Sequence, residues 1–414
     1  MNRKSLRRAL AIAVSMGCMV SHSMIGQQVV DEHWVGTWAS AQMLDDVSDI
    51  RLDDSPAVTV RETVHVSAGG SRVRIHLSNA FGNEPLLIEA VHLAKPASVA
   101  DCRIDPATDK PVTFAGKSSV VIPIGAEYFS DPVDYPLEAL SDLTVTMYLH
   151  APSGHQTGHS SSLTTSCVSG QNLITAAEMP GKKVTHWFYL VGVDVESAPD
   201  AAAIVTIGDS ITDGGNSIIN GNARWPDVLA ARLQSDPATR RWSVLNAGIS
   251  GNRVLSNNSG PNALARWDRD VTSQTGVRAV IVLEGVNDLG GWTINAPLSR
   301  QEHQEHVAQL IAAYEQMIAR GHARGLKVIG ATILSYSGSV HYHPDDENER
   351  DRESVNDWIR QPGHFDGVID FDKVTTDPAR QGWMKTDIDS GDHLHPSSAG
   401  HKAMGDSIPL SLFK

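Results

Sequence analysis

From residue 200 onward, short apolar runs alternate with helical segments, and this alternation is the strongest constraint on what the chain can fold into. The runs are AAIVTIGDS (202–210), WSVLNAG (242–248), RAVIVLEGVND (278–288), LKVIGATIL (326–334) and GVIDF (367–371). Strands that are apolar on both faces and separated by helices are typical of a parallel sheet covered by helices on either side. The sequence therefore predicts an α/β fold with three layers, helix, sheet and helix.

The segments between these runs have the composition and period of helices. They are RWPDVLAARLQ (224–234), QEHVAQLIAAYEQMIARGHARG (304–325), RESVNDWIRQ (352–361) and SSAGHKAMGDSIPLSLF (397–413). Each follows an apolar run, as the connection between parallel strands requires.

Residues 30–197 have a different pattern, in which apolar and polar residues alternate. In AVTVRETVHVS (57–67) and SRVRIHLSN (71–79) apolar side chains recur at every second position, and the AGG between them has the composition of a turn. A period of two, broken by Gly, Pro and Asp, indicates antiparallel strands. We interpret the two segments as a hairpin and expect a β-sandwich, jelly-roll-like domain here.

The N-terminus has the features of a secretory signal peptide. MNRKSLRR is basic, ALAIAVSMGCMV is apolar, and SHS supplies small residues near a cleavage point. We predict a signal peptide at 1–26, a β-sandwich accessory domain at 30–197 and a second domain at 200–414. The protein is then expected to be secreted or periplasmic; a short membrane anchor and a lipoprotein acylated at Cys18 stay open as alternatives.

Composition argues against several partners. The 414 residues carry a formal charge of −14, and no Lys/Arg cluster lies beyond the N-terminus. Such a chain is repelled by nucleic acid and by anionic membrane surfaces, so we expect neither as a partner. No later segment is long and apolar enough for stable membrane insertion. The oligomeric state is left open.

Two cysteines lie beyond the N-terminal segment, Cys102 and Cys167. In an oxidising compartment they can form one disulfide, and two unpaired thiols are the alternative. Nothing around either cysteine resembles a Cys/His nucleophile motif.

Residues with catalytic potential follow the first three apolar runs. Ser210 comes directly after Gly208-Asp209, Gly251 lies in NAGISGNR, and Asn287 lies in EGVND. Because the carboxyl ends of parallel strands share one edge of a sheet, where α/β proteins bind ligands, we expect these residues close together. Taken singly, each has an ordinary structural explanation as a helix cap or a turn residue.

The segment GDHLHPSSAGH (391–401) adds a carboxylate and an imidazole, Asp392 and His395. Pro396 favours an extended His395 and keeps it out of the following helix. A serine hydroxyl becomes a good nucleophile when a base takes its proton, and a carboxylate holds that base in the required tautomer. The set predicts acyl transfer with Ser210 as nucleophile, His395 as base and Asp392 as the orienting acid.

Acyl transfer also needs fixed donors for the oxyanion of the tetrahedral intermediate. We expect them to be the backbone N–H groups of Ser210 and Gly251 and the side-chain amide of Asn287. The N-terminus of a helix that begins near Ser210 is expected to favour the same negative charge.

Together, GDSITDGG, NAGISGNR, EGVND and DHLHP resemble the four blocks of the SGNH, or GDSL, hydrolase superfamily, in the family's order over about residues 203–410. The resemblance implies a flavodoxin-like sheet and a serine esterase or lipase that needs no metal and no cofactor. It assigns the catalytic triad to Ser210, Asp392 and His395, and the oxyanion hole to Ser210, Gly251 and Asn287.

The β-rich part resembles the N-terminal region of a secreted bacterial two-domain subgroup of that superfamily, through WVGTWASAQ, RIHLSNAFGNEPL and YFSDPVDYPL. An α/β-hydrolase lipase shares the order Ser…Asp…His. It is disfavoured because Ser210 lies in Gly-Asp-Ser-Ile rather than in G-x-S-x-G, and because the acid lies only three residues before the histidine.

We interpret the chain as a secreted serine esterase that acts on a small-molecule or polysaccharide ester, with short acyl groups such as acetyl on carbohydrate as the expected substrate. A lipase or lysophospholipase acting on longer acyl chains and an acyltransferase are the alternatives within this chemistry. The alternative from another class is a carbohydrate-binding protein whose α/β half is an inactive scaffold.

Other polar residues near the motifs invite functional interpretations. His341 and His343 in HYHP, with acidic residues just after them, suggest a metal site. Their place between a strand end and a helix favours an active-site loop instead. Asp209, Glu284 and Asp288 flank the motifs, and we interpret all three as scaffold.

Overall fold

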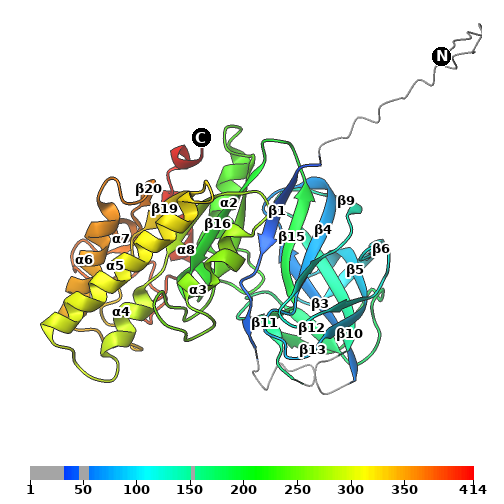
Figure 1. Ribbon diagram of the computed structural model, residues 1–414, viewed down its shortest axis with the longest axis horizontal. Coiled ribbons are helices and arrows are strands. Elements are labelled where there is room, and N and C mark those ends of the chain that lie inside the picture. The colour runs from blue at the N-terminus through cyan, green and yellow to red at the C-terminus, as the bar shows by residue number, and fades with distance from the viewer. Residues whose placement is uncertain (1–31, 46–55, 151–153) are drawn as a thin grey trace, which may run out of the picture. The chain divides into compact units, whose positions relative to one another are not determined.

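Two kinds of sheet make up the structure, a computed structural model that describes residues 32–45, 56–150 and 154–414 (Figure 1). Antiparallel strands occupy the part of the chain before residue 200, and a parallel sheet with helices follows. The predicted signal peptide, residues 1–26, lies outside the described residues.

The parallel sheet has five strands in the order β17-β16-β18-β19-β20. Numbered from the first of these strands in the chain, the order is 2-1-3-4-5, that of flavodoxin-like folds. Every residue of the central strand β16 is buried, which explains its unbroken apolar sequence. The predicted flavodoxin-like α/β fold is confirmed. The strands are β16 (Ala202–Gly208), β17 (Trp242–Gly248), β18 (Val277–Leu283), β19 (Lys327–Ala331) and β20 (Gly367–Ile369).

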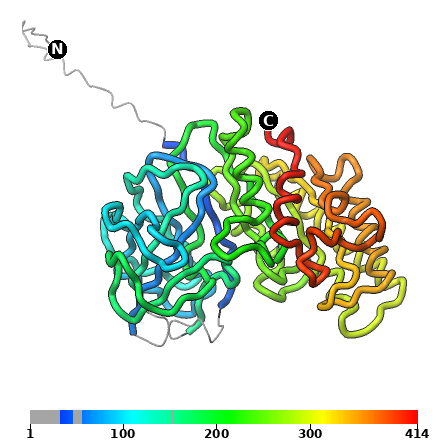
Figure 2. Tube along the Cα trace, turned by 180° about the vertical axis from the view of Figure 1, so that it is seen from behind, coloured from blue at the N-terminus to red at the C-terminus, as the bar shows by residue number. Residues whose placement is uncertain are grey.

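Helices connect these strands. The predicted helical segments correspond to α2, α5, α6 and α8, and α5 begins with a capping box formed by Ser299 and Glu302. Helix α8 lies against α2, and Figure 2 shows the red C-terminal part of the chain beside the green α2. The helices are α1 (Ser210–Asp213), α2 (Trp225–Ser235), α3 (Ala263–Trp267), η2 (Asp268–Thr272), α4 (Val286–Thr293), α5 (Arg300–His322), α6 (Asp346–Arg360), α7 (Phe371–Thr375), α8 (Ser398–Ser407) and η3 (Leu410–Phe413).

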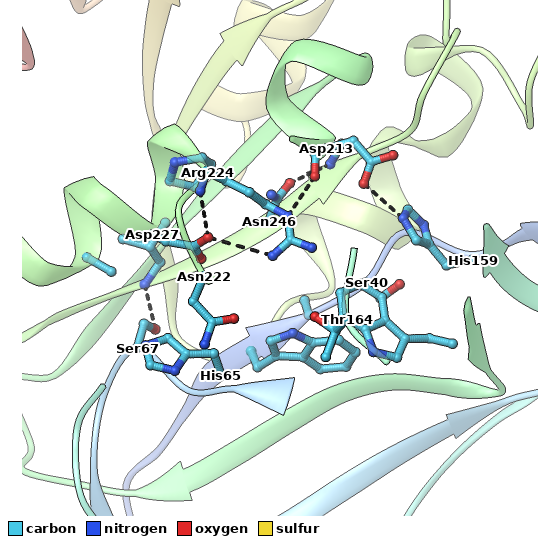
Figure 3. A pocket seen from close by; sticks show the side chains of 17 residues that line it. Ser40, His65, Ser67, His159, Thr164, Asp213, Asn222, Arg224, Asp227 and Asn246 are labelled. Carbon is cyan, nitrogen blue, oxygen red and sulfur yellow. Dashed lines mark hydrogen bonds and ion pairs between the residues drawn. The ribbon is translucent and has the colours of Figure 1, made fainter. Parts of the chain in front are cut away.

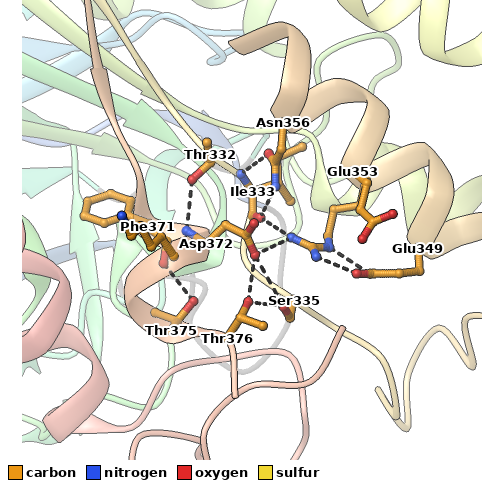
Figure 4. Close-up of polar contacts among 12 residues, drawn as sticks. Thr332, Ile333, Ser335, Glu349, Glu353, Asn356, Phe371, Asp372, Thr375 and Thr376 are labelled. Carbon is orange, nitrogen blue, oxygen red and sulfur yellow. Dashed lines mark hydrogen bonds and ion pairs between the residues drawn. The ribbon is translucent and has the colours of Figure 1, made fainter. Parts of the chain in front are cut away.

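A buried arginine, Arg352 of α6, fixes the chain that follows β19. Figure 4 labels its partners Ile333, Glu349 and Asp372. The Arg352 guanidinium donates to the backbone carbonyl of Ile333 at 2.9 Å, to the Asp372 carboxylate at 2.7 Å and to the Glu349 carboxylate at 2.6 Å. A buried cation is tolerated only when its donors meet acceptors, as they do here. The segment held in this way leads to Tyr342, which reaches the site described below.

The part before residue 200 contains antiparallel sheets, as predicted for a β-rich region. Their orders are β1-β15-β4-β8 with β9 also on β4, β13-β12-β3-β10-β5-β6 with β7 also on β5, and β14-β11-β2. The strands are β1 (Trp34–Ala39), β2 (Met43–Leu44), β3 (Ala57–His65), β4 (Gly70–Ser78), β5 (Leu86–Ser98), β6 (Arg103–Val112), β7 (Val120–Ile122), β8 (Glu127–Phe129), β9 (Val133–Leu137), β10 (Asp142–His150), β11 (Thr157–Ser160), β12 (Ser166–Ser169), β13 (Lys182–Val184), β14 (His186–Phe188) and β15 (Leu190–Glu196).

The predicted hairpin of residues 57–67 and 71–79 is wrong. β3 pairs with β10 and β12, whereas β4 pairs with β15, β8 and β9, so the two consecutive strands belong to different sheets. Distant segments hold the connection between them: the Val66 N–H donates to Ser141, and the Ser67 N–H donates to Thr37. Alternating apolar residues identify a strand and its buried face, but they do not identify its neighbour.

A disulfide joins Cys102 and Cys167. Both residues are buried and pack with Met179 in a small apolar cluster of their own. The disulfide resolves the alternative that the sequence leaves open, in favour of the oxidised pair.

The first strand, β1, lies against the parallel sheet. The Gly36 N–H donates to the Thr275 carbonyl at 2.9 Å, and the Ser243 hydroxyl donates to the Gly36 carbonyl at 2.5 Å. A side chain at Gly36 would come within 2.9 Å of a Leu245 methyl group, so glycine permits the close approach. Residues 33–414 form one compact unit. The division into domains at 30–197 and 200–414 stays a prediction.

None of the helices in the described ranges combines the length and the apolar character needed to cross a bilayer.

Candidate active site

A cavity of about 590 Å³ opens at the carboxyl edge of the parallel sheet, and residues of all four motifs line it. Ser210 follows the end of β16, Gly251 follows the end of β17, and Asn287 follows the end of β18. Asp392 and His395 reach the same cavity from the segment before α8. The structure therefore brings all five predicted site residues together at the sheet edge.

The turn that carries Ser210 is held rigidly by its neighbours. The Asp209 carboxylate caps α1 by accepting from the Ile211 N–H at 2.9 Å. The Ser210 carbonyl accepts from the N–H groups of Gly214 at 2.9 Å and Gly215 at 2.7 Å. A side chain at Gly208 would come within 2.4 Å of the Leu283 carbonyl oxygen, so the strand end that leads to Ser210 requires glycine.

Three side chains form a hydrogen-bonded series at the cavity. Ser210 Oγ lies 2.8 Å from His395 Nε2, and His395 Nδ1 lies 2.7 Å from Asp392 Oδ2. An ionised carboxylate only accepts hydrogen bonds, so Nδ1 carries the ring proton and Nε2 is free to accept from the Ser210 hydroxyl. This is the tautomer in which the imidazole can take a proton from serine.

Asp392 is held in its ionised form. Partial burial raises the pKa of Asp392, but hydrogen bonds from the His395 backbone N–H, the His395 side chain and the Leu394 N–H outweigh burial and lower this pKa. The Ser390 hydroxyl also donates to the same carboxylate at 2.9 Å, and the Asn216 amide donates to it at 3.2 Å. The negative charge that orients His395 is therefore secured by the loop itself.

One side chain and one backbone carbonyl orient the Asn287 amide. Its Oδ1 accepts from the Tyr342 hydroxyl at 2.7 Å, and its Nδ2 donates to the Asn252 carbonyl at 2.8 Å. A primary amide has two N–H groups, so one remains for another acceptor. Asn287 lies in the first turn of α4, a helix that the sequence interpretation as a turn asparagine did not include.

Tyr342 was missed from the sequence, although it lies between His341 and His343 in the segment interpreted as an active-site loop. Its ring packs against Gly290, where a side chain would come within 2.3 Å of the ring. Burial raises the pKa of Tyr342 to about 12, so the hydroxyl keeps its proton and acts as a donor at neutral pH. The sequence gives only a weak indication of a role for Tyr342, namely its place in a segment that follows the end of a strand.

Gly251 lines the cavity in a turn with a left-handed backbone, φ +76°. A side chain there would be strained, and would come within 2.8 Å of the Ser259 hydroxyl. Within the described ranges, no protein acceptor takes the backbone N–H of Ser210 or that of Gly251. Ser210, Gly251 and Asn287 line the same cavity, so their N–H groups are the candidate oxyanion donors of this site.

Behind the cavity, buried charges hold the strand ends. The Arg266 guanidinium donates to the carbonyls of Gly208 at 2.9 Å and Ala247 at 2.6 Å, and to the Asn252 side chain at 2.9 Å. The Asp288 carboxylate accepts from the N–H groups of Val254 at 2.8 Å and Leu255 at 3.0 Å. These contacts are with the scaffold, in line with the interpretation of Asp288.

Asp209 and Glu284 are also buried behind the nucleophile. Burial raises the pKa of Asp209 to about 7, and it raises the pKa of Glu284 as well. The Asp209 carboxylate contacts the backbone of α1. The helix itself contradicts one expectation: α1 is a single turn of four residues, too short to contribute the dipole of a long helix to the oxyanion site.

In the described part of the chain, no group of three or more His, Cys, Asp or Glu side chains is arranged to hold a metal ion. His343 has a left-handed backbone, φ +48°, and His341 lines the cavity.

The flavodoxin-like sheet and the polar series at its edge define a class of protein, the carboxylic ester hydrolases. Residues 206–403 match the GDSL-like Lipase/Acylhydrolase family. The match supports, for these residues, the GDSL-like domain that the four motifs predict.

Solved structures of low identity are similar to about half of the chain. A G-D-S-L family protein from Desulfitobacterium hafniense DCB-2 is 21% identical with a TM-score of 0.38, over 50% of this chain and 97% of its own. A GDSL-like lipase from Bacteroides thetaiotaomicron VPI-5482 is 17% identical with a TM-score of 0.37, over 52% and 90%. An acetyl xylan esterase from Geobacillus stearothermophilus is 19% identical with a TM-score of 0.36, over 50% and 94%. No curated protein matches the chain.

Proposed function

We propose that the protein is a secreted serine esterase that removes short acyl groups, above all acetyl, from carbohydrate through an acyl-enzyme on Ser210. The observation that carries the proposal is the series of contacts from Ser210 Oγ to His395 at 2.8 Å and from His395 to Asp392 at 2.7 Å, beside an open cavity. A hydroxyl, a base and an orienting acid in this order are what acyl transfer to serine needs.

Each step can be followed through these residues. Ser210 Oγ attacks the ester carbonyl carbon while His395 Nε2 takes the hydroxyl proton. The oxygen of the tetrahedral intermediate accepts from the N–H groups of Ser210 and Gly251 and from the free N–H of Asn287. His395 then gives its proton to the departing alcohol. Water attacks the acyl-enzyme while His395 takes a proton from that water. His395 then returns the proton to Ser210 Oγ as the bond to the acyl group breaks and the acid leaves.

The lining of the cavity supports a polar alcohol and a short acyl group. Val340 and Leu394 are the aliphatic side chains in the lining, and we expect two such residues to suit a short acyl group better than a long one. Around the catalytic residues the lining supplies hydroxyl, amide and imidazole groups, which bind hydroxyl groups by hydrogen bonds: Ser250, Asn258, Ser259 and His341.

Two features support export. The basic and apolar sequence of residues 1–26 is that of a secretory signal peptide. The disulfide between Cys102 and Cys167 is a bond that persists in oxidising compartments and is rare in the cytosol.

The test is a substrate series with the mature protein. We expect hydrolysis of p-nitrophenyl acetate and release of acetate from acetylated polysaccharides, with rates that fall as the acyl chain lengthens. Ser210→Ala is the matched control, because it removes one oxygen at a site held by backbone contacts, and we expect it to fold normally and to be inactive.

Other results of these substrate experiments would favour a lipase, an acyltransferase or a carbohydrate-binding protein. A preference for acyl chains of eight carbons or more would replace the short-chain proposal with a lipase or lysophospholipase. An acylated sugar as the main product in the presence of a sugar acceptor would indicate an acyltransferase. Glycan binding without labelling of Ser210 by a fluorophosphonate would indicate a binding protein.

A further inference from the structure

The buried aspartate Asp213 has no role in the mechanism above. It connects the catalytic turn to the β-rich strands through a contact with His159. Asp213 ends α1, three residues after Ser210, and its side chain is 5% exposed. It lies beside a small cavity of about 30 Å³, opposite His159 of β11 (Figure 3). One carboxylate oxygen accepts from His159 Nε2 at 3.0 Å. The other accepts from the Ser250 N–H at 3.0 Å and from the Ser250 hydroxyl at 2.6 Å.

His159 carries a proton on both ring nitrogens. Nδ1 lies 2.7 Å from the Ala41 carbonyl, and Nε2 faces the Asp213 carboxylate. Both partners only accept, so both nitrogens must donate and the ring is an imidazolium. Burial lowers the pKa of His159, but the charge and the hydrogen bond of Asp213 outweigh burial and raise this pKa overall.

The other titratable groups around this imidazolium leave Asp213 as its anion. The Arg224 guanidinium repels His159 but donates through Nε to the backbone carbonyl of Asp213 at 2.7 Å. His186 of β14 contacts Asp45, and burial together with the charge of His159 lowers the pKa of His186 to about 3. His186 therefore stays neutral, and His159 is the charged imidazole of this wall.

Ser250 carries the effect of Asp213 to the oxyanion site, because it directly precedes Gly251. With its N–H and its hydroxyl both bonded to one carboxylate oxygen, Ser250 has a fixed orientation. The Asn252 N–H closes the same turn by donating to the Ile249 carbonyl at 3.0 Å. The peptide group between Ser250 and Gly251 is therefore fixed in two ways. Asp213 binds Ser250, and the hydrogen bond from Asn252 to Ile249 closes the turn.

We propose that His159 is a positioning residue for ester hydrolysis: its imidazolium, supplied by the β-rich part of the chain, fixes Asp213 and through Ser250 aims the Gly251 N–H at the oxyanion. The inference rests on the proposed function, since it needs an oxyanion to form beside Ser210. It gives the β-rich part a role in the chemical step that is independent of any contact with substrate.

The first test compares two buried histidines of the β-rich part. His159→Gln replaces the imidazolium, and His76→Gln is the matched control, because His76 pairs with Asp194 at 2.9 Å and its side chain is 9% exposed. Both variants should lose folding stability. Only His159→Gln should lose kcat toward p-nitrophenyl acetate, by roughly 10- to 100-fold, because misaiming an oxyanion donor costs less than the roughly 10²–10³-fold of removing one. KM should stay within about twofold, because the ground state does not use the oxyanion donors.

A pH series adds a readout that loss of packing would not change. The pKa of His159 is raised in the folded protein, so its ion pair with Asp213 is intact below the ordinary histidine value and is lost as pH rises through the folded value. The ratio of wild-type kcat to His159→Gln kcat should therefore shrink as pH rises. A ratio that stays constant from neutral to alkaline pH would contradict the imidazolium.

A second variant keeps the inference testable if His159→Gln does not fold. Ser250→Ala removes the 2.6 Å hydroxyl contact with Asp213 and leaves the backbone N–H in place. It should fold, with a loss of about 1 kcal/mol of unfolding free energy, and lose kcat several-fold. Wild-type kcat in folded His159→Gln or in Ser250→Ala, alongside an inactive Ser210→Ala, overturns the positioning role and leaves the esterase proposal standing. Activity in Ser210→Ala equal to wild type overturns the esterase proposal itself.

Discussion

Two of the histidine–aspartate pairs in the described part of the chain contact the catalytic turn or its serine, one at the cavity and one in the wall against the β-rich strands. In the cavity pair His395 Nδ1 lies 2.7 Å from Asp392, and in the wall pair His159 Nε2 lies 3.0 Å from Asp213. The cavity side chains are 20% and 33% exposed, whereas the wall side chains are 2% and 5% exposed. The two pairs share their chemistry and differ in their surroundings.

The second nitrogen of each ring decides what the pair can do. In His395 it faces the Ser210 hydroxyl, which can donate, so the neutral ring can exist and accept a proton. In His159 it faces the Ala41 carbonyl, which can only accept, and with the Asp213 carboxylate on the other nitrogen this favours the charged ring. Both histidines contact an aspartate, so the aspartate does not explain the difference between them. The group on the other ring nitrogen does: the Ser210 hydroxyl allows His395 to act as a base, and the Ala41 carbonyl favours a charged His159.

The largest expected effect separates the two pairs by activity. His395→Gln should lower kcat by more than roughly 10³-fold, because a hydroxyl without its base is a weak nucleophile. The partly exposed pair contributes little to folding, so urea unfolding of this variant should match wild type. If His395→Gln and His159→Gln had comparable kcat values, the proposed difference between a catalytic base and a charged positioning residue would be wrong.

The next largest effect concerns the oxyanion donors, which are needed for the reaction at the cavity pair. Asn287→Ala should lower kcat roughly 10²–10³-fold with little change in KM, because it removes one oxyanion donor. Steady-state kinetics with p-nitrophenyl acetate measures both constants. If KM rises while kcat is kept, Asn287 binds the ground state and belongs to substrate recognition instead.

Replacing each aspartate by its amide sharpens the comparison further. Asp392→Asn should keep a few per cent of wild-type kcat and nearly all of the stability. Asp213→Asn should cost about 3 kcal/mol of unfolding free energy, because it leaves the buried His159 without its counter-charge. Urea titration of the two variants at pH 6, where His159 is charged, checks the contrast. Equal losses of stability would show that burial does not distinguish the pairs.

A smaller effect is expected at Tyr342, which orients Asn287. Tyr342→Phe removes a hydrogen bond of 2.7 Å and leaves the ring against Gly290. A net loss of about 1 kcal/mol corresponds to a decrease in kcat of roughly fivefold. Asn287→Ala is the control background: the tyrosine change should have no further effect there, and an additive loss would mean that Tyr342 acts by another route.

The smallest effect is a pH dependence of stability at the cavity pair. The pKa of Asp392 is lowered in the folded protein, so its contribution to stability is present above the unfolded value near 4 and is lost as pH falls through the folded value. The difference in unfolding free energy between wild type and Asp392→Asn should be constant from pH 7 to about 5 and shrink below about pH 4. A difference that shrinks already between pH 7 and 5 would contradict the lowered pKa.

The parallel sheet was predictable because its strands are mostly buried and rich in apolar residues, above all β16, in which every residue is buried. The meeting of Ser210, Gly251 and Asn287 at one edge follows from the same fold, since parallel strands end together. The catalytic roles of these residues stay predictions that the experiments above address.

The rest depended on contacts between distant segments. The partners of β3 and β4 come from elsewhere in the β-rich part, and alternation cannot name them. Tyr342 acts on a residue 55 positions away, and His159 acts on one 54 positions away, so no local pattern marks either. The local sequence indicates which face of a segment is buried. The residues that pack against that face are determined by the tertiary structure.

The pairing of β1 with β15 has a consequence for biosynthesis. Trp34 lies opposite Glu196, so the first strand to leave the ribosome meets its neighbour only after nearly the whole β-rich part has been translated. Until then the unpaired edge of β1 can capture strands from other nascent chains. A holdase chaperone that covers this segment should therefore raise the yield of native protein, and should do so most during the first half of translation.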